Sequence, residues 1–271
     1  MFSSIPLLTL LSLKEMVMEL LLIIFIAFLV AVLFSMLGLG GAIIYTPLFF
    51  WLGVPLLAAI PMALLLNTIT TASASMTYLK QRLVDKRVAF PIIFTSIIGA
   101  FTGSYLAPKV DTEVIILLLS LILLLASIRI LFFNSIGFPA GTLDRKTPYL
   151  NTGFIGAGAG LLIGIVSSLV GIGGGTFVVT LLLILGFKTK NAVATSAFII
   201  TFMSLSGFLG HLNFGEQQLD IRLLLYAGAA AFIGAQAGSR VIFRRTSPRT
   251  IERMFALVLL FMVGKLLYGL M

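Results

Sequence analysis

The chain contains no cysteine and very little charge. Of its 271 residues, none is Cys, one is His and only 10% are Asp, Glu, Lys or Arg. Disulfides, thiolate metal sites and cysteine nucleophiles are therefore excluded. A single histidine and the absence of a carboxylate pair within the apolar runs leave no catalytic triad, metal cluster or acid–base dyad. We therefore expect a protein that is not an enzyme and needs no cofactor.

Apolar residues make up most of the chain. They account for 60% of it, with a mean hydropathy of +1.18, whereas a soluble domain is about half apolar and about a quarter charged. Runs of about 20 apolar residues recur from end to end, and each could cross about 30 Å of hydrocarbon. A transmembrane barrel would instead show short alternating segments. The sequence therefore predicts an all-α polytopic membrane protein, located in the cell membrane with lipid around it.

The net charge is +9. In a soluble protein this excess would indicate a nucleic-acid partner. Here the lysine and arginine residues gather in short segments between apolar runs, as they do in loops that face the cytoplasm. We therefore expect no nucleic-acid partner.

Ten apolar helices follow one another in two similar sets of five. The first set is expected over residues 16–37, 42–52, 56–79, 88–107 and 114–133. The second set is expected over residues 150–170, 176–185, 191–212, 223–241 and 254–270. The longest polar stretch, 134–149, predicts a cytoplasmic linker between an N-terminal repeat, 1–133, and a C-terminal repeat, 150–271.

The two sets also share sequence. Residues 35–41 read SMLGLGG and residues 168–174 read SLVGIGG, an offset of 133 positions. The same offset pairs Thr68 with Thr201, and an offset of 135 pairs Asp85 with Asp220. Matches along two registers are not expected of unrelated helices, so we infer an internal duplication.

The basic segments favour one orientation of the halves. If residues 80–87 face the cytoplasm and each glycine-rich break is a hairpin that returns to its own side, every densely basic loop falls inside. The two halves are then inverted. Parallel halves would require 42–79 to form one span, which is too long, or two, one of which is too short. We therefore predict two inverted structural repeats with glycine-broken helices at mid-membrane.

The glycine-rich segments 38–41 and 171–175 interrupt apolar helices. A helix that stops inside the bilayer exposes backbone groups that only protein or a water-filled cavity can satisfy. Ala42 and Thr176 would begin half-helices whose unpaired N–H groups and positive dipole ends suit an anion. Paired breaks of this kind indicate a transporter's binding site.

Four other glycines carry a different meaning. Gly99, Gly103, Gly234 and Gly238 lie four residues apart within full-length helices. This spacing is typical of tight helix packing through small residues.

Hydroxyl side chains crowd the predicted helices 56–79 and 191–212. Their donors could hold an oxyanion, or they could bond to their own helix and join neighbouring helices. No Asp or Glu lies near the centre of a predicted span, so an anionic cargo fits better than a cation. The predicted substrate-binding residues are Gly40, Gly41, Ala42, Asn67, Thr68, Thr71, Gly173, Gly174, Gly175, Thr176, Thr195, Ser196, Thr201 and Ser204.

These motifs resemble those of the sulfite exporter TauE/SafE family. The resemblance lies in Gly38-Leu39-Gly40-Gly41-Ala42 with Thr46-Pro47, in Gly171-Ile172-Gly173-Gly174-Gly175, and in Ala192-Val193-Ala194-Thr195-Ser196 after Lys190-Asn191, and it covers about the whole chain. It implies a bacterial or archaeal inner-membrane permease of two homologous halves. Cargo in that family includes sulfite and small organosulfur or carboxylate anions, usually exported.

We therefore expect a secondary transporter that exports a small sulfur-containing oxyanion, such as sulfite or sulfoacetate, by alternating access. An anion channel with the same site is one alternative, and an importer of a small carboxylate or sulfonate is another. A subunit or scaffold without transport of its own is a third. The sequence leaves a homodimer open.

Overall fold

The structure is a computed structural model that describes residues 7–132, 149–215, 219–241, 259–264 and 266. Its described part is helical and contains no strand. The predicted linker, apart from Tyr149, and much of the last predicted helix lie outside the described residues.

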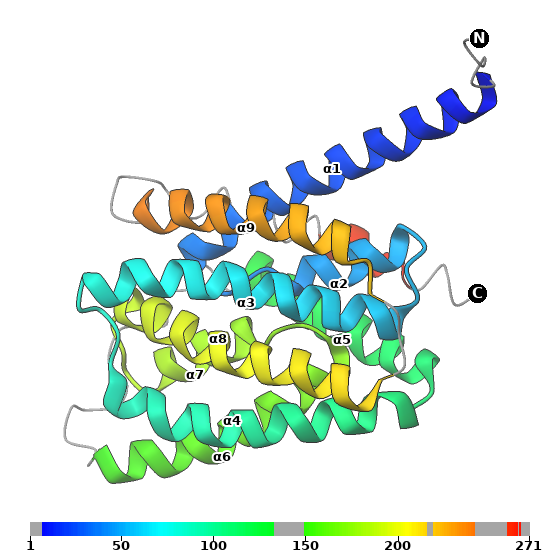
Figure 1. Cartoon of the computed structure of the whole chain (residues 1–271). Coiled ribbons are helices and arrows are strands. Elements are labelled where there is room, and N and C mark those ends of the chain that lie inside the picture. Colours follow the sequence, from blue (N-terminus) through cyan, green and yellow to red (C-terminus); the bar gives the residue numbers. More distant parts are fainter. Residues whose placement is uncertain (1–6, 133–148, 216–218, 242–258, 265, 267–271) are drawn as a thin grey trace.

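Nine α-helices and one short 3-10 helix follow in order through the described residues up to 241 (Figure 1). They are α1 (Leu7–Leu37), α2 (Ala42–Trp51), α3 (Leu56–Lys80), α4 (Lys86–Leu106), η1 (Ala107–Lys109), α5 (Thr112–Phe132), α6 (Tyr149–Val170), α7 (Gly175–Ile184), α8 (Thr189–Phe214) and α9 (Ile221–Val241). Residues 259–264 are also helical.

Five of the described helices are long and apolar enough to cross a membrane. The candidate spans are Leu20–Leu37, Leu56–Lys80, Lys86–Lys109, Thr189–Phe214 and Ile221–Arg240. The prediction of an all-α polytopic membrane protein is confirmed. The predicted breaks are also present, because α1 and α6 both end just before a glycine-rich segment.

Large apolar side chains cover the outer faces of the bundle. Phe94 is 69% exposed, Leu225 68% and Leu162 65%. Apolar surface on this scale is unfavourable in water. In a bilayer these side chains face hydrocarbon instead, which is how a protein with so apolar a composition stays folded.

The helices pack in a palindromic order. α1 packs against α9, α9 against α3, α3 against α8, α8 against α4, and α4 against α6. The offsets between the halves pair α1 with α6, α3 with α8 and α4 with α9, so the order is the same from either end. Figure 1 shows this arrangement, with α3 and α8 between the α1–α9 and α4–α6 pairs. Each half thus contributes helices to both outer layers.

Small residues allow the outer pairs to approach closely. A Cβ atom at Gly99 or Gly103 of α4 would collide with backbone atoms of α6. A Cβ atom at Gly234 or Gly238 of α9 would collide with backbone atoms of α1 in the same way. The prediction of tight packing at these four glycines is confirmed.

Two equivalent aspartates cap equivalent helices. The carboxylate of Asp85 accepts hydrogen bonds from the N–H groups of Arg87, at 3.0 Å, and Val88, at 3.4 Å, at the start of α4. Asp220 accepts one from the N–H of Leu223, at 3.0 Å, at the start of α9. A side-chain cap satisfies amide groups that have no partner within the helix. The 135-residue offset therefore pairs residues with the same structural role.

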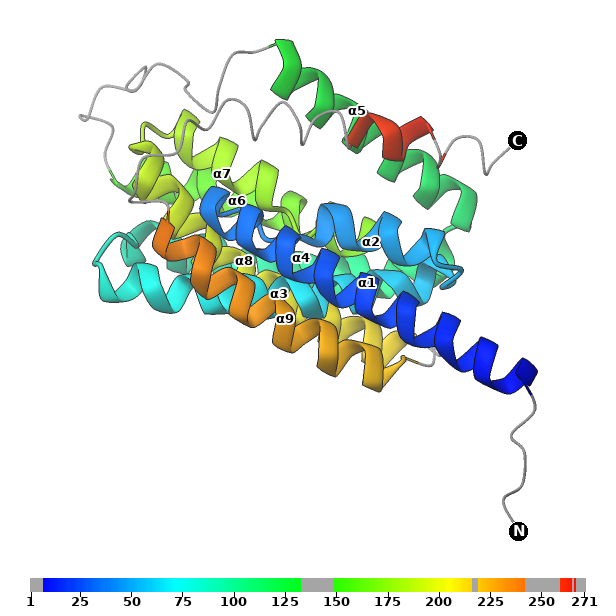
Figure 2. The same ribbon diagram turned by 90° about the horizontal axis from the view of Figure 1, so that it is seen from above.

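The two short helices lie on one side of the bundle. Figure 2 shows α2 and α7 on the same side of the α3–α8 pair, with α5 beyond them. α2 packs against α3, and α7 packs against α8. The starts of both short helices are thereby placed beside the two central helices.

Candidate functional site

The two glycine-rich breaks touch each other inside the protein. A Cβ atom at Gly175 would collide with the backbone carbonyl of Leu39, so the start of α7 lies directly against the first break. Both segments rely on left-handed backbone that only glycine adopts readily. The glycines with positive φ in the breaks are Gly38, Gly40, Gly171, Gly173 and Gly174.

The side chain of Asn67 caps the start of α2. Its Oδ1 accepts hydrogen bonds from the N–H groups of Gly41, at 2.5 Å, and Ala42, at 3.0 Å. Its Nδ2 donates to the hydroxyl of Ser204 on α8, at 2.7 Å. Asn67, which is fully buried, therefore joins α2, α3 and α8 through one amide group.

Glycine is required on both sides of this amide. A Cβ atom at Gly40, in the first break, would collide with Oδ1 of Asn67. A Cβ atom at Gly173, in the second break, would collide with its Nδ2. The crossing of the two breaks is thus centred on Asn67.

The first half-helix differs from the expectation. We expected the N–H of Ala42 to be unpaired and available to an anion, whereas the structure pairs it with Asn67. The sequence places Asn67 25 residues further along the chain, so its role as a cap depends on tertiary packing.

The second half-helix has no such cap. α7 begins at Gly175, one residue before the expected Thr176, with Gly174 as its N-cap at φ +66° and no side-chain hydrogen bond. The 133-residue offset places Ile200 where the first half has Asn67, and an isoleucine side chain cannot accept a hydrogen bond. The two half-sites are therefore chemically unequal.

Several predicted hydroxyls bond to their own helix. Thr68 donates to the carbonyl of Leu64, and Thr71 to that of Asn67, each at 2.8 Å. Thr201 donates to the carbonyl of Ala197, also at 2.8 Å. These three hydroxyls therefore bond to their own helix, which is the alternative to holding an oxyanion. Ser204 is different, because its oxygen accepts from Asn67.

Thr195 and Ser196 lie at the first turns of α8. Ser196 donates to the carbonyl of Gly38 at 2.9 Å, so it contacts the first break. The hydroxyl oxygen of Thr195 accepts from the N–H of Asp85 at 3.0 Å, so it faces the loop between α3 and α4. The structure therefore separates these two neighbours, and only Ser196 touches the breaks.

Two equivalent contacts join the helices before the breaks to the central helices α3 and α8. Tyr78 donates to the carbonyl of Ser35 at 2.5 Å, and Nε2 of His211 lies 2.9 Å from the carbonyl of Ser168. A carbonyl can only accept, so Nε2 of His211 carries the proton. The 133-residue offset pairs Tyr78 with His211 and Ser35 with Ser168, a signal that was available in the sequence.

Thr46 also belongs to this region, although it is absent from the predicted site. Its hydroxyl donates to the carbonyl of Gly171 at 2.5 Å, which ties α2 to the second break.

Within the described residues, no group of three His, Cys, Asp or Glu side chains could hold a metal ion. The polar groups that meet at the crossing are neutral amides, hydroxyls and backbone groups.

Comparison of the sequence with known proteins places this chain in a family. The family model described as sulfite exporter TauE/SafE matches residues 23–266. Curated relatives include the "Probable membrane transporter protein YunE" of Bacillus subtilis, which is 27% identical over 86% of this chain and 92% of the relative. The "Probable membrane transporter protein MJ0441" of Methanocaldococcus jannaschii is 23% identical over 90% of this chain and 94% of the relative.

The "Probable membrane transporter protein ORF9" of Sinorhizobium sp is 27% identical over 84% of this chain and 85% of the relative. No solved structure matches the chain. The matched family model covers both glycine-rich breaks and the central helices α3 and α8. This chain is a membrane transporter protein of the sulfite exporter TauE/SafE family.

Proposed function

We propose that the chain is a secondary transporter of the bacterial or archaeal inner membrane that exports a small sulfur-containing oxyanion, such as sulfite or sulfoacetate. The carrying observation is the meeting of the two half-helix starts around Asn67. The printed descriptions of the family and its relatives, a sulfite exporter and membrane transporters, support the same class of function.

The donors at the crossing suit an oxyanion. The start of α7 has no side-chain cap, and N–H groups at a helix start favour negative charge. The Nδ2 group of Asn67 and the hydroxyl of Ser204 add neutral donors beside it. Because the donors are neutral, binding an anion would not require burial of a second full charge.

Alternating access would come from movement of one half against the other. The palindromic packing order supports halves that are related by a pseudo-two-fold axis. We propose that this axis lies in the membrane plane, so that the repeats are inverted. The contacts of Tyr78 and His211 would then lie at opposite ends of the pathway, one for each half.

Counterflow in proteoliposomes tests the proposal. Purified protein is reconstituted, loaded with unlabelled sulfite and diluted into a trace of radiolabelled sulfite. A carrier exchanges label faster when cargo is present on the far side, and we expect that acceleration. Flux that ignores sulfite on the far side would identify an anion channel, and no sulfite flux in liposomes that contain folded protein would reject the proposal.

A further inference from the structure

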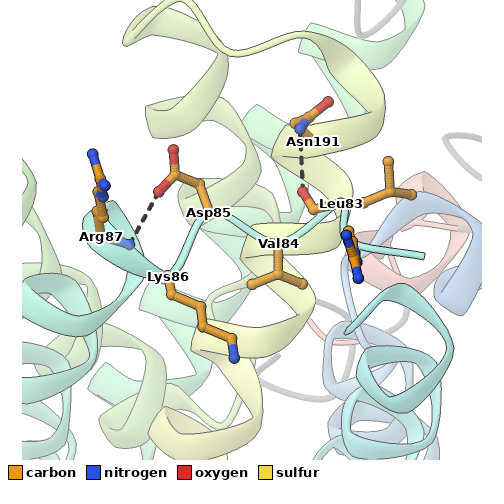
Figure 3. Close-up of a pocket in the computed structure, with 7 residues that line it drawn as sticks. Leu83, Val84, Asp85, Lys86, Arg87 and Asn191 are labelled. Carbon is orange, nitrogen blue, oxygen red and sulfur yellow. Dashed lines mark hydrogen bonds between the residues drawn. The ribbon is translucent and has the colours of Figure 1, made fainter. Parts of the chain in front are cut away.

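A polar pocket lies between the α3–α4 loop and the start of α8 (Figure 3). Its volume is about 460 Å³. It is lined by Arg82, Leu83, Val84, Asp85, Lys86, Arg87 and Asn191. None of these residues belongs to the crossing of the glycine-rich breaks.

The loop is held on α8 at two points. Nδ2 of Asn191 donates to the carbonyl of Leu83 at 3.2 Å, and the N–H of Asp85 donates to the hydroxyl of Thr195 at 3.0 Å. Arg82 has φ +56°, and it is the only non-glycine residue in the described part of the chain with a positive φ. This residue ends α3 in a Schellman motif, in which the N–H of Arg82 donates to the carbonyl of Leu79 and that of Leu83 to the carbonyl of Tyr78. The loop is therefore fixed by the local helix end and by its two contacts with α8.

The charge of the lining favours an anion. Arg82, Lys86 and Arg87 bring three cations, and Asp85 brings one carboxylate. Figure 3 shows that carboxylate turned to the backbone N–H of Arg87, which it caps. Its charge is thus partly offset by the start of α4, while the three cationic side chains are exposed to solvent.

Two adjacent residues of α8 contact the pocket loop and the first glycine-rich break. Thr195 contacts the loop that forms the pocket, and the next residue, Ser196, donates to the carbonyl of Gly38. An anion in the pocket would therefore lie next to the segment that leads to Asn67.

The two ends of the protein differ in charge. Residues 80–87 contain four cations and one carboxylate, whereas residues 211–222 contain two carboxylates and one cation. A cleft lined by one sign of charge raises the local concentration of the opposite ion. The positive-inside tendency assigns the basic end to the cytoplasm, so the field would favour entry of an anion from that side.

We propose that this pocket is the cytoplasmic collecting site for the oxyanion cargo, an inference that rests on the proposed function. The three cations attract the anion out of bulk solution, and the second turn of α8, at Thr195 and Ser196, leads from the pocket towards the crossing of the breaks. The pocket raises the local concentration of the anion at the entrance, whereas the crossing binds the anion during transport.

The cysteine-free chain permits a direct test that needs no transport. Val84→Cys places the protein's single thiol in the pocket, and Leu83→Cys serves if that variant folds poorly. Its modification is timed with a sulfonate-bearing and a trimethylammonium-bearing methanethiosulfonate. We expect the rate with the sulfonate reagent, divided by the rate with the trimethylammonium reagent, to fall by about tenfold when Lys86→Gln and Arg87→Gln are added. Each lost positive charge removes attraction for the anionic reagent at close range.

Arg222→Gln is the matched control, because the 135-residue offset pairs Arg222 with Arg87 at the opposite end of the bundle. We expect this variant to leave the ratio unchanged. Sulfate, used as the competing oxyanion, should slow modification by the sulfonate reagent and have no such effect once the two cations are removed. An unchanged ratio, or no protection by sulfate, would overturn the proposal.

The lipid composition separates cargo from a lipid headgroup. The thiol assay is repeated in vesicles of phosphatidylcholine alone and in vesicles that also contain phosphatidylglycerol. Protection by sulfate in phosphatidylcholine supports a collecting site. Protection by phosphatidylglycerol in place of sulfate would identify an anionic lipid site and overturn the proposal.

Transport measurements then separate this inference from the proposed function. We expect Lys86→Gln/Arg87→Gln to raise the KM for sulfite on the cytoplasmic side by about tenfold, with the maximal rate retained. If sulfate protects the Val84→Cys thiol but the wild-type protein moves no sulfite, the proposed function alone is refuted. Sulfite flux with wild-type KM in the double variant would refute the collecting site alone.

Discussion

Replacing Asn67 by aspartate adds one negative charge where the anion is proposed to bind and changes little else. The carboxylate keeps an oxygen that can accept from the N–H groups of Gly41 and Ala42, the two bonds that cap α2. Ser204 now accepts from Nδ2 of Asn67, and its hydroxyl can rotate to donate to the new oxygen. Asn67→Asp therefore keeps the cap of α2, although an ionised carboxylate at this buried position costs some stability.

The size of the effect follows from Coulomb's law. Two unit negative charges about 5 Å apart repel by about 3 kcal/mol at an effective dielectric constant of about 20. This energy corresponds to a loss of affinity of about a hundredfold, because each 1.4 kcal/mol is a factor of about ten. Asn67→Ala removes the cap without adding charge, and the unpaired buried N–H groups should cost about 1–3 kcal/mol of stability.

The assay is sulfite counterflow at several cargo concentrations, with melting temperature measured on the same preparations. We expect Asn67→Asp to fold with a lowered melting temperature and to need about a hundredfold more sulfite than the wild type for half-maximal flux. Asn213→Asp makes the same amide-to-acid change at an exposed position of α8 and should transport normally. Wild-type flux in Asn67→Asp would refute an anion site at this amide.

Three further predictions concern packing, capping and orientation. Gly99→Ala should lower the melting temperature in detergent, because its Cβ meets backbone of α6, whereas Gly158→Ala, with open space around it, should not; equal melting of the two would contradict the packing. Asp85→Ala should cost about 1 kcal/mol of stability as a lost N-cap, measured by denaturant unfolding, and no change would contradict its capping role. A single cysteine at Lys188 should react with impermeant reagents only from the cytoplasmic side, and one at Arg222 only from outside; the opposite pattern would contradict the assumed orientation.

The helix bounds and the breaks were open to prediction because their signals are local. Apolar length marks a span, and a glycine cluster marks where regular helix cannot continue. The expected helix 56–79 is observed as Leu56–Lys80, and 191–212 as Thr189–Phe214. Spacing of Gly99 and Gly103 predicted close packing, but it could not name α6 as the partner, since spacing describes one face of one helix.

The contacts at the crossing could not be predicted from the sequence, because they depend on tertiary packing. A side chain caps a helix start when tertiary packing brings it there, and Asn67 reaches Ala42 from a different helix. Thr195 and Ser196 are adjacent in sequence, yet successive residues on a helix point about 100° apart, so they serve different partners. The sequence thus indicated the region of the site, and only the fold shows which polar group meets which.

Anomalous diffraction from crystals soaked with selenite, a heavier analogue of sulfite, tests the central claim most directly. We predict a strong selenium peak at the crossing of the two breaks, with the selenite oxygens within hydrogen-bonding distance of Nδ2 of Asn67 or of the backbone N–H groups at Gly174–Thr176. A strong peak elsewhere in the bundle, with none at the crossing of the two breaks, would contradict it.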